Sequence, residues 1–370
     1  MEHKPYHGGN LWEAAQKFGI KPQDFIDFSA NINPLGPSPK AIQKIKSNLE
    51  MIRHYPQPGA EELKSELAGY LGIPEENLLL GNGAAELIYM LGRHFDSRRI
   101  VLAAPCFSEY GEGSLKSEFK YIDLGAEDGF AIKANAFMPE IKPGDVVYIG
   151  NPNNPTATLT PPDELLRIFE ECQKKGATLV VDEAFIDFVD EEEKYTLRHE
   201  ACKQPEDCCV KNSGLIVLGS LTKFFALPGL RLGYLVSSAE NIKFFEKLLP
   251  TWRINSLAQV AGVASLNDQE YIQRTKINNK KEREFLLDGL QKINGIKPYR
   301  SHANFILVNC KETGRDIHQI QNYLGLQGIL IRRCDTYRNL DEYYLRLAVR
   351  LRGDNERLLE LLERYLGVRK

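Results

Sequence analysis

Short apolar segments alternate with amphipathic helical segments from residue 59 to residue 236, and this alternation most constrains the fold. The first segment, Gly59–Leu71, has the spacing of a helix, because Leu63, Leu67, Tyr70 and Leu71 share one face. The apolar runs that follow are typical of buried strands and cover residues 77–80, 145–149, 178–185 and 231–236. Since parallel strands are joined by crossover helices, the sequence predicts an α/β fold with a mainly parallel sheet flanked by helices.

The remainder of the chain has a different pattern. Beyond Pro250 a long helical region leads to an apolar run at residues 302–308. A terminal helix follows, in which one apolar face is formed by Leu358, Leu361, Leu362, Tyr365 and Leu366. This part is therefore expected to form a smaller α+β region.

Lys223 lies in the segment Ser220–Tyr234, which has the residues needed to bind pyridoxal phosphate. A lysine amine can form an imine with the cofactor aldehyde, and the hydroxyls of Ser220 and Thr222 and the guanidinium of Arg231 can hold a phosphate. Free lysine has a pKa near ~10.4, so this amine would need activation by desolvation or a neighbouring cation. Taken alone, such a lysine is more often an ordinary surface residue. The assignment therefore depends on motifs upstream.

Three upstream motifs support it. Asp182 ends an apolar strand, where open α/β sheets bind ligands, and could pair with the pyridine nitrogen; capping a helix or joining a structural ion pair is the alternative. Asn154, in the turn Gly150–Thr156, could donate to the phenolic oxygen of the cofactor, although such a turn is weak evidence alone. Glycines in the segment Gly81–Glu86, between a strand and a helix, let backbone N–H groups approach a phosphate.

In the order GNGAAE, NPNNPT, DEAF and SLTKFFALPGLRLGY, these motifs resemble those of fold-type I pyridoxal-phosphate enzymes of the aminotransferase superfamily. The resemblance implies a large cofactor-binding domain of residues 46–255 and a small domain made of residues 1–45 and 256–370. It also implies an active site between the domains that a homodimer completes.

The resemblance further assigns roles to single residues. It makes Lys223 the imine-forming lysine, Asp182 the partner of the ring nitrogen, and Asn154 the partner of the phenolic oxygen. The remaining cofactor-binding positions are the stacking aromatic Phe107, the phosphate-binding residues Gly83, Ala84, Ser220, Thr222 and Arg231, and Tyr55 from the second subunit. The substrate-binding positions are Arg346 for a carboxylate and His7, Gly8, Asn31 and Arg332 for the rest of the substrate and its phosphate, with Asn154 beside them. Each has a plainer alternative: Phe107 could be a core residue, Arg332 could lie on a solvated strand edge, and His7 could belong to a disordered terminus.

A closer resemblance is to the threonine-phosphate decarboxylases. It rests on the HGGN sequence at residues 7–10 and on the segments 27–36, 182–188, 329–332 and 343–350. Histidinol-phosphate aminotransferases share the core motifs, but typically have tyrosine at the position of Phe185 and lack HGGN. The expected reaction is therefore decarboxylation of L-threonine O-3-phosphate to (R)-1-amino-2-propanol O-2-phosphate and CO₂ in cobalamin biosynthesis. The alternatives are a histidinol-phosphate-type aminotransferase and, more remotely, a non-catalytic cofactor-binding regulator.

Composition excludes other classes of protein. The 370 residues carry a net charge of −3, which gives no electrostatic case for nucleic acid or an anionic membrane as partner. The start has no apolar leader and no run is long enough to span a membrane, so a cytoplasmic location is expected. The seven cysteines include no C-x-x-C pair, so neither a metal site nor a secreted disulfide framework is predicted. The expected partners are a phosphorylated amino acid and a second copy of the chain.

Three local features are specific to this chain. Ala84 and Ala85 stand where relatives often have hydroxyl or acidic side chains, so phosphate binding would depend on backbone N–H groups. Segment 190–214, which contains Cys202, Cys208 and Cys209, is interpreted as a surface insertion. A helix is expected to begin after Thr160, with Thr160 as its N-cap.

Overall fold

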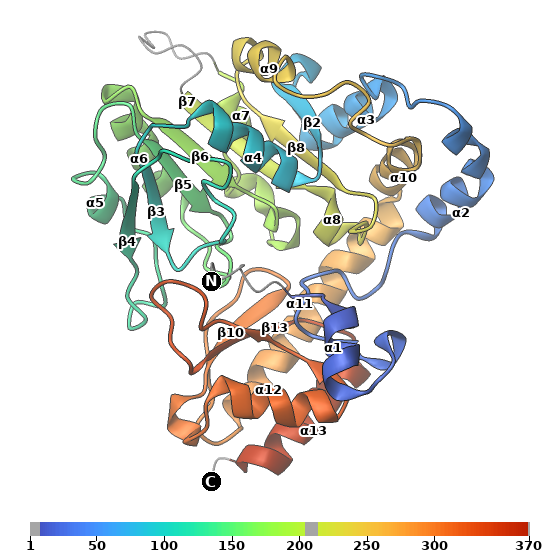
Figure 1. The fold of residues 1–370 in the computed structure, drawn as a ribbon, viewed down its shortest axis with the longest axis vertical. Helices are drawn as coiled ribbons and strands as arrows, with labels where there is room; N and C mark the ends of the chain where they lie inside the picture. The colour runs from blue at the N-terminus through green and yellow to red at the C-terminus, as the bar shows by residue number, and fades with distance from the viewer. Residues whose placement is uncertain (1–7, 204–213, 369–370) are drawn as a thin grey trace.

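In a computed structural model of the chain, residues 8–203 and 214–368 are described, and they form two regions, each with its own sheet (Figure 1). His7, Cys208 and Cys209 lie outside the described residues. The larger region contains a seven-stranded sheet in the order β2-β8-β7-β6-β5-β3-β4. Its strands are β2 (Leu78–Asn82), β3 (Ile100–Ala104), β4 (Phe119–Asp123), β5 (Val146–Gly150), β6 (Thr178–Asp182), β7 (Gly214–Ser220) and β8 (Leu232–Val236). All neighbours run parallel except at β8, which is antiparallel to both β2 and β7. The predicted mainly parallel α/β sheet is thus confirmed.

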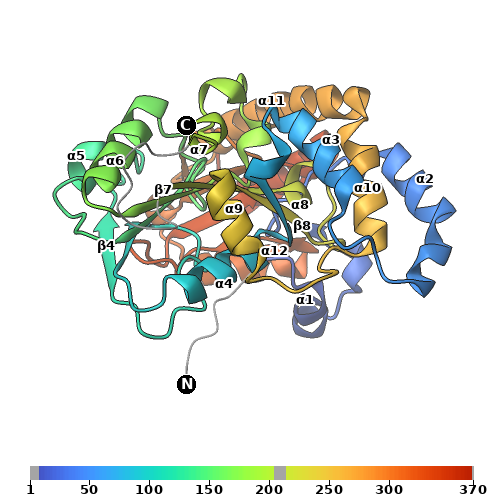
Figure 2. The same cartoon turned by 90° about the horizontal axis from the view of Figure 1, so that it is seen from above.

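Helices cover both faces of this sheet, which explains why its central strands β5, β6 and β7 are buried at every position and mostly apolar. In β6, Val180 packs into one hydrophobic cluster with α4 and α9, whereas Leu179 and Val181 pack into another with α3, α6 and α7. Figure 2 shows α4 and α9 on one side of the sheet and α3, α6 and α7 on the other. The helices of this region are α2 (Pro39–Ser47), α3 (Glu61–Leu71), α4 (Ala84–His94), α5 (Ala134–Phe137), α6 (Pro162–Lys174), α7 (Arg198–Ala201), α8 (Leu221–Phe224), α9 (Ala239–Glu246) and α10 (Ser256–Leu266), and short 3₁₀ turns lie at Leu49–Arg53, Glu75–Asn77, Ile186–Phe188 and Glu192–Lys194.

The parallel register brings the functional motifs to one edge of the sheet. Gly150, the last residue of β5, is paired with Asp182 at the end of β6, and Asp182 is paired with Leu218 near the end of β7. The segments that follow β5 and β7 contain Asn154 and Lys223, so all three motifs leave the sheet at its carboxyl edge.

The smaller region is built on an antiparallel sheet in the order β12-β13-β10-β9 and on the parallel pair β1-β11. These strands are β1 (Ile26–Asp27), β9 (Lys297–Pro298), β10 (Phe305–Asn309), β11 (Ile329–Leu330), β12 (Arg332–Arg333) and β13 (Tyr344–Ala348). The helices are α1 (Leu11–Phe18), α11 (Gln269–Gln291), α12 (Ile317–Leu326) and α13 (Arg352–Leu366), with 3₁₀ turns at Pro22–Asp24 and Lys311–Thr313. The long helix α11 runs from the larger region into the smaller one, and α1 lies beside α12 (Figure 1). Residues from both ends of the chain therefore build this region.

Two sequence-based expectations require correction. Helix α6 begins at Pro162 with Pro161 as N-cap, and Thr160 does not cap it. Instead, the backbone N–H of Thr160 donates to the Asn151 side chain at 2.8 Å, so Thr160 anchors the turn that carries Asn154. Segment 190–203 is also more than a surface insertion, because Arg198 and Ala201 of α7 are buried.

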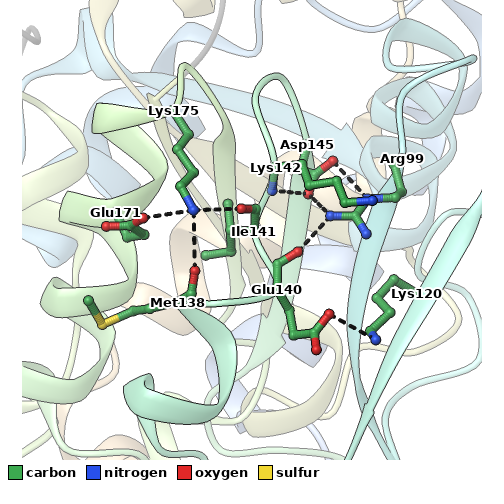
Figure 3. Close-up of polar contacts among 9 residues, drawn as sticks. All are labelled: Arg99, Lys120, Met138, Glu140, Ile141, Lys142, Asp145, Glu171 and Lys175. Atoms are coloured by element: carbon green, nitrogen blue, oxygen red, sulfur yellow. Dashed lines mark hydrogen bonds and ion pairs between the residues drawn. The ribbon is translucent and has the colours of Figure 1, made fainter.

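At the opposite edge of the large sheet, a group of charged residues forms hydrogen bonds and ion pairs near the starts of β3 and β5 (Figure 3). Arg99 makes two hydrogen bonds to Asp145, at 2.6 and 3.1 Å, and a third to the carbonyl of Glu140 at 2.6 Å. Lys175 donates to the carbonyl of Ile141 at 2.7 Å. This group lies at the starts of β3 and β5, away from the motifs described above.

Within the described part of the chain, no helix is long and apolar enough to cross a membrane. The same residues contain no group of three or more histidine, cysteine or acidic side chains that could hold a metal ion. The five described cysteines are all free thiols.

Candidate active site

A cavity of about 240 Å³ lies at the carboxyl edge of the large sheet and is lined by residues from both regions. It brings together most of the residues predicted from the sequence, namely Gly8, Asn31, Ala84, Phe107, Asn154, Asp182, Ser220, Thr222, Lys223, Arg231, Arg332 and Arg346. Gly83 immediately precedes the lining residue Ala84. Tyr55 does not line this cavity; its side chain is 80 % exposed and stacks on Trp252 with a 4.7 Å centroid separation.

Lys223 occupies a short helical turn directly after β7. The pKa of its amine is lowered to about 8, mainly by burial and then by the positive charges of Arg346 and Arg231, while Asp182 opposes these effects. At pH 7 about a tenth of the amine is therefore neutral, and so nucleophilic, compared with less than about a thousandth for an unshifted lysine. Both forms of activation expected from the sequence, desolvation and neighbouring cations, act on Lys223.

Asp182 is buried at the end of β6 and is held in place by two donors. The hydroxyl of Tyr110 donates to its Oδ2 at 2.9 Å, and the backbone N–H of Ala184 donates to its Oδ1 at 3.0 Å. Burial raises the pKa of this carboxyl, whereas the two hydrogen bonds and the charge of Lys223 oppose the rise. The site thus presents a fixed acceptor that a cationic ring nitrogen would stabilise as a carboxylate.

Arg346, in β13, enters the cavity from the smaller region and contacts the larger one. Its Nη1 donates to Asn154 Oδ1 at 2.6 Å, and its Nη2 donates to the carbonyl of Ser29 at 2.8 Å. Its guanidinium also lies over the ring of Phe305, 5.2 Å from the centroid. The Nε of Arg346 is buried and has no hydrogen-bond partner among the described residues. This arginine is therefore oriented in advance and retains a donor for an anion.

A group suited to a phosphate lies at the N-terminus of α4. Ala84 and Ala85 open the helix, so their side chains offer no donor, and unsatisfied backbone N–H groups point out of the helix end. The hydroxyls of Ser220 and Thr222 lie 2.6 Å apart beside it. Gly83 has φ +80°, and a β-carbon there would lie 2.6 Å from Arg231 Nη2. Position 83 therefore requires glycine for two reasons: its positive φ, and the close packing of the Arg231 guanidinium against it.

The remaining predicted residues complete the walls. Phe107 packs edge-on against Tyr110, with ring centroids 5.7 Å apart. Asn31 is buried, and its Oδ1 has no hydrogen-bond partner within the described ranges. Arg332 is buried in β12 and lies over the ring of Tyr337. Arg332 is therefore not a solvated strand edge, the alternative that its sequence position allowed.

Sequence reasoning did not single out Tyr110, Ser29 and Tyr337, which also line the cavity. Tyr110 follows Phe107 by three residues in a loop, and no periodic pattern indicates that its hydroxyl meets a carboxylate 72 positions away. Ser29 contributes a backbone carbonyl, which any residue type could provide. The Asx-type spacing of Asp27 and Ser29 was the available signal for a fixed turn there.

The residues of this cavity fit pyridoxal phosphate. The cofactor needs an amine of lowered pKa, an acceptor for its ring nitrogen, a flat apolar partner for its ring and donors for its phosphate. Lys223, Asp182, Phe107 and the α4 N-terminus provide these in one cavity. Two buried polar atoms of its lining have no hydrogen-bond partner among the described residues: Oδ1 of Asn31, which follows β1, and Nε of Arg346, which lies in β13.

Comparison with known proteins agrees with this geometry. The aminotransferase class I and II family profile matches residues 23–364. A threonine-phosphate decarboxylase of Salmonella typhimurium is 36 % identical over 365 residues, which are 97 % of this chain and 96 % of that protein. A bifunctional adenosylcobalamin biosynthesis protein of Leptospira interrogans is 32 % identical over 99 % of this chain and 42 % of its own length. The crystal structure of a histidinol-phosphate aminotransferase from Clostridium acetobutylicum superposes with a TM-score of 0.80 at 28 % identity, covering 92 % of this chain and 98 % of that one. The chain belongs to the aminotransferase class I and II family, whose members are pyridoxal-phosphate enzymes.

Proposed function

We propose that this protein decarboxylates L-threonine O-3-phosphate to (R)-1-amino-2-propanol O-2-phosphate and CO₂, as a pyridoxal-phosphate enzyme of cobalamin biosynthesis. The observation that carries the proposal is the placement of Lys223, Asp182 and Arg346 around one cavity. Its chemistry is supported by the 36 % identity to a threonine-phosphate decarboxylase over nearly the whole of both chains. The pathway is supported by the similarity to the adenosylcobalamin biosynthesis protein.

Bound pyridoxal phosphate would supply a reactive aldehyde carbon and a ring that accepts the electron pair of a broken bond at the substrate Cα. In our proposal Lys223 binds the aldehyde carbon, Asp182 pairs with the ring nitrogen, and Phe107 stacks on the ring. Asn154 Nδ2 donates to the phenolic oxygen, because its Oδ1 is engaged by Arg346. The α4 N-terminus with Gly83 and Ala84, together with Ser220, Thr222 and Arg231, holds the phosphate.

Arg346 would bind the substrate carboxylate, and Arg332, Asn31, Gly8 and His7 would bind the substrate phosphate. Anchoring both ends fixes the orientation of the substrate about Cα, and orientation decides which bond breaks. With the substrate so held, the Cα–carboxylate bond would break and CO₂ would depart without the bonding electron pair. That pair would remain with Cα, stabilised by the electron-accepting ring that bound cofactor would supply. A proton from Lys223 Nζ then replaces the carboxylate at Cα, so the overall reaction consumes one proton and releases CO₂.

A homodimer is part of the proposal. Tyr55 and Trp252 form an exposed stacked pair, with side chains 80 % and 45 % accessible. An exposed aromatic pair of this kind is typical of an interface, and Tyr55 would reach the cavity of the second subunit. The cytoplasmic location expected from the sequence remains a prediction.

Two incubations test the function. Purified protein loaded with cofactor is given L-threonine O-3-phosphate in one, and histidinol phosphate with 2-oxoglutarate in the other. The proposal expects CO₂ release in the first, without dependence on any keto acid. Glutamate formation in the second, with no CO₂ in the first, would identify an aminotransferase instead. Absence of both reactions in protein with bound cofactor would favour a regulator.

A further inference from the structure

The N-terminal segment, defined here as residues 8–10, packs mainly against Ser29. The backbone N–H of Gly9 donates to Ser29 Oγ at 2.8 Å. Gly8 lies against the backbone carbonyl of the same residue, so closely that a β-carbon on Gly8 would be 2.1 Å from the Ser29 oxygen. Gly8 also lines the cavity. The segment is therefore a wall of the active site that depends on Ser29 for its position.

Ser29 is itself held firmly. Its hydroxyl and its backbone N–H both donate to Asp27 Oδ1, at 2.5 and 2.7 Å. The flanking residue Phe28 is hydrogen-bonded on both sides, to the carbonyl of Leu330 and from the N–H of Ala348. Because the Ser29 hydroxyl donates its proton to Asp27, its lone pairs are free to accept from Gly9. The side chain is thus oriented as an acceptor toward the N-terminal segment.

The carbonyl of Ser29 meanwhile accepts from Arg346 Nη2 at 2.8 Å. One residue therefore contacts the N-terminal segment through its side chain and the carboxylate-binding arginine through its backbone. The Gly8 main chain lies directly against the oxygen that Arg346 binds, and Ser29 and Arg346 are only 4 % and 6 % exposed, so this hydrogen bond is shielded from solvent. An ionic hydrogen bond is stronger where water is excluded.

We propose that Ser29 is a positioning residue that seats the N-terminal segment over Arg346, and that this seating strengthens the binding of a ligand carboxylate. The inference rests on the proposed role of Arg346. In this arrangement, loosening the segment admits water to the guanidinium and weakens carboxylate binding, although Arg346 itself is unchanged. Ser29 acts through Gly9 and Arg346, without touching the reacting atoms.

The test uses Ser29→Ala in the full-length holoenzyme. Two quantities are measured: hydrogen–deuterium exchange of peptides covering residues 8–14, and the dissociation constants of L-threonine O-3-phosphate and L-alanine from changes in cofactor absorbance. We expect faster exchange at Gly9 and dissociation constants that rise about five- to tenfold for both ligands, as for the loss of one hydrogen bond and its shielding. Ser265→Ala is the matched control, because Ser265 is also buried and hydrogen-bonded, to the carbonyl of Ala261 in α10. It should change neither quantity.

Gly8→Ala provides a second route to the same state, since its β-carbon would push the segment off Ser29. Both substitutions disrupt the same contact between the N-terminal segment and Ser29. The double variant should therefore bind L-alanine no more weakly than the single variant that has the lower affinity for it. Unchanged exchange in Ser29→Ala, or faster exchange with unchanged affinity for L-alanine, would overturn the inference. The exchange and L-alanine measurements do not depend on decarboxylation. Failure of the proposed reaction would therefore leave them able to decide the role of Ser29.

Discussion

The hydroxyl of Tyr110 donates a buried hydrogen bond of 2.9 Å to Oδ2 of Asp182. Tyr110 is 3 % exposed and Asp182 is 8 % exposed, so water cannot readily replace this donor. The two residues come from the loop after β3 and from the end of β6, and their contact fixes the carboxylate beneath the cavity. Because the bond favours the charged form of Asp182, it opposes the effect of burial, which raises the pKa of that carboxyl.

Replacing Tyr110 with Phe should therefore weaken cofactor binding. A hydrogen bond to a charged group contributes about 1.5–3 kcal/mol, so we expect the cofactor dissociation constant to rise roughly tenfold or more. The pKa of Asp182 should also rise further, and cofactor binding should then be lost at a higher pH as the solution is acidified. Absorbance titrations at several pH values measure both effects. Tyr148→Phe is the control, because Tyr148 stacks on Tyr110 but its hydroxyl has no partner among the described residues; equal losses in both variants would contradict this role of Tyr110.

Lys223→Met should stabilise the cofactor-free protein. With a pKa lowered to about 8, the protonated amine of Lys223 destabilises the fold at neutral pH by about 3 kcal/mol. The unfolded chain binds this proton up to pH ~10.4, so the free energy of unfolding of the parent protein should rise between about pH 8 and 10. The variant should lack this rise and should be the more stable protein at pH 7. Urea unfolding at pH 7 and pH 10 measures the difference, with exposed Lys46→Met as control.

The same variant tests the chemistry. Lys223→Met should lose the visible absorbance of a cofactor bound through lysine, together with turnover. A variant that keeps both would exclude Lys223 as the attachment point, whatever its effect on stability.

Much of the fold could be predicted from the sequence because its central strands carry an unambiguous signal. In β6 both faces are buried, so Thr178–Val181 is apolar at nearly every position, and the carboxylate of Asp182 marks the end of the strand. Each of the four motifs follows the carboxyl end of an apolar strand. The parallel register of β5, β6 and β7 places three of these ends at one edge, and the antiparallel pairings of β2 and β7 with β8 place the end of β2 there too. These are local patterns joined by a simple topological rule.

The residues that could not be predicted depend on contacts between distant segments. The bond from Tyr110 to Asp182 spans 72 positions, and that from Arg346 to the Ser29 carbonyl spans 317. Thr160 was expected to cap α6, but Pro161 is the N-cap. The backbone N–H of Thr160 donates to the Asn151 side chain, a contact that forms only when the turn between them folds. Segment 190–203 has the composition of a surface loop. However, the backbone N–H of Leu197 donates to the buried carboxylate of Glu183, which holds this part of the segment against the protein interior. Composition does not encode such pairings.

Arg346→Lys should weaken the binding of carboxylate ligands while sparing the cofactor. Lysine keeps the charge but cannot reach both Asn154 and Ser29 with the planar geometry of a guanidinium. We expect KM for the amino-acid substrate to rise about ten- to a hundredfold, with the cofactor dissociation constant within about twofold of the parent. Steady-state kinetics and cofactor titration measure the two quantities. Arg357→Lys is the control, because the Arg357 side chain is 41 % exposed and pairs with Glu360 in α13. An unchanged KM in Arg346→Lys would exclude Arg346 from the substrate site.

The charged residues in Figure 3 should contribute to the free energy of unfolding but not to kcat. The side chains of Arg99 and Asp145 are 12 % and 3 % exposed, so removing Arg99 leaves a buried carboxylate without its cation. Arg99→Leu should lower the free energy of unfolding by about 3–5 kcal/mol, as measured by urea titration. The nearby pair between Lys120 and Glu140 is 37 % and 42 % exposed, and Lys120→Ala should cost less than about 1 kcal/mol. Since this group lies at the starts of β3 and β5, kcat per folded molecule should be unchanged in both variants. A fall in kcat without a fall in stability would show that the two edges of the sheet are coupled.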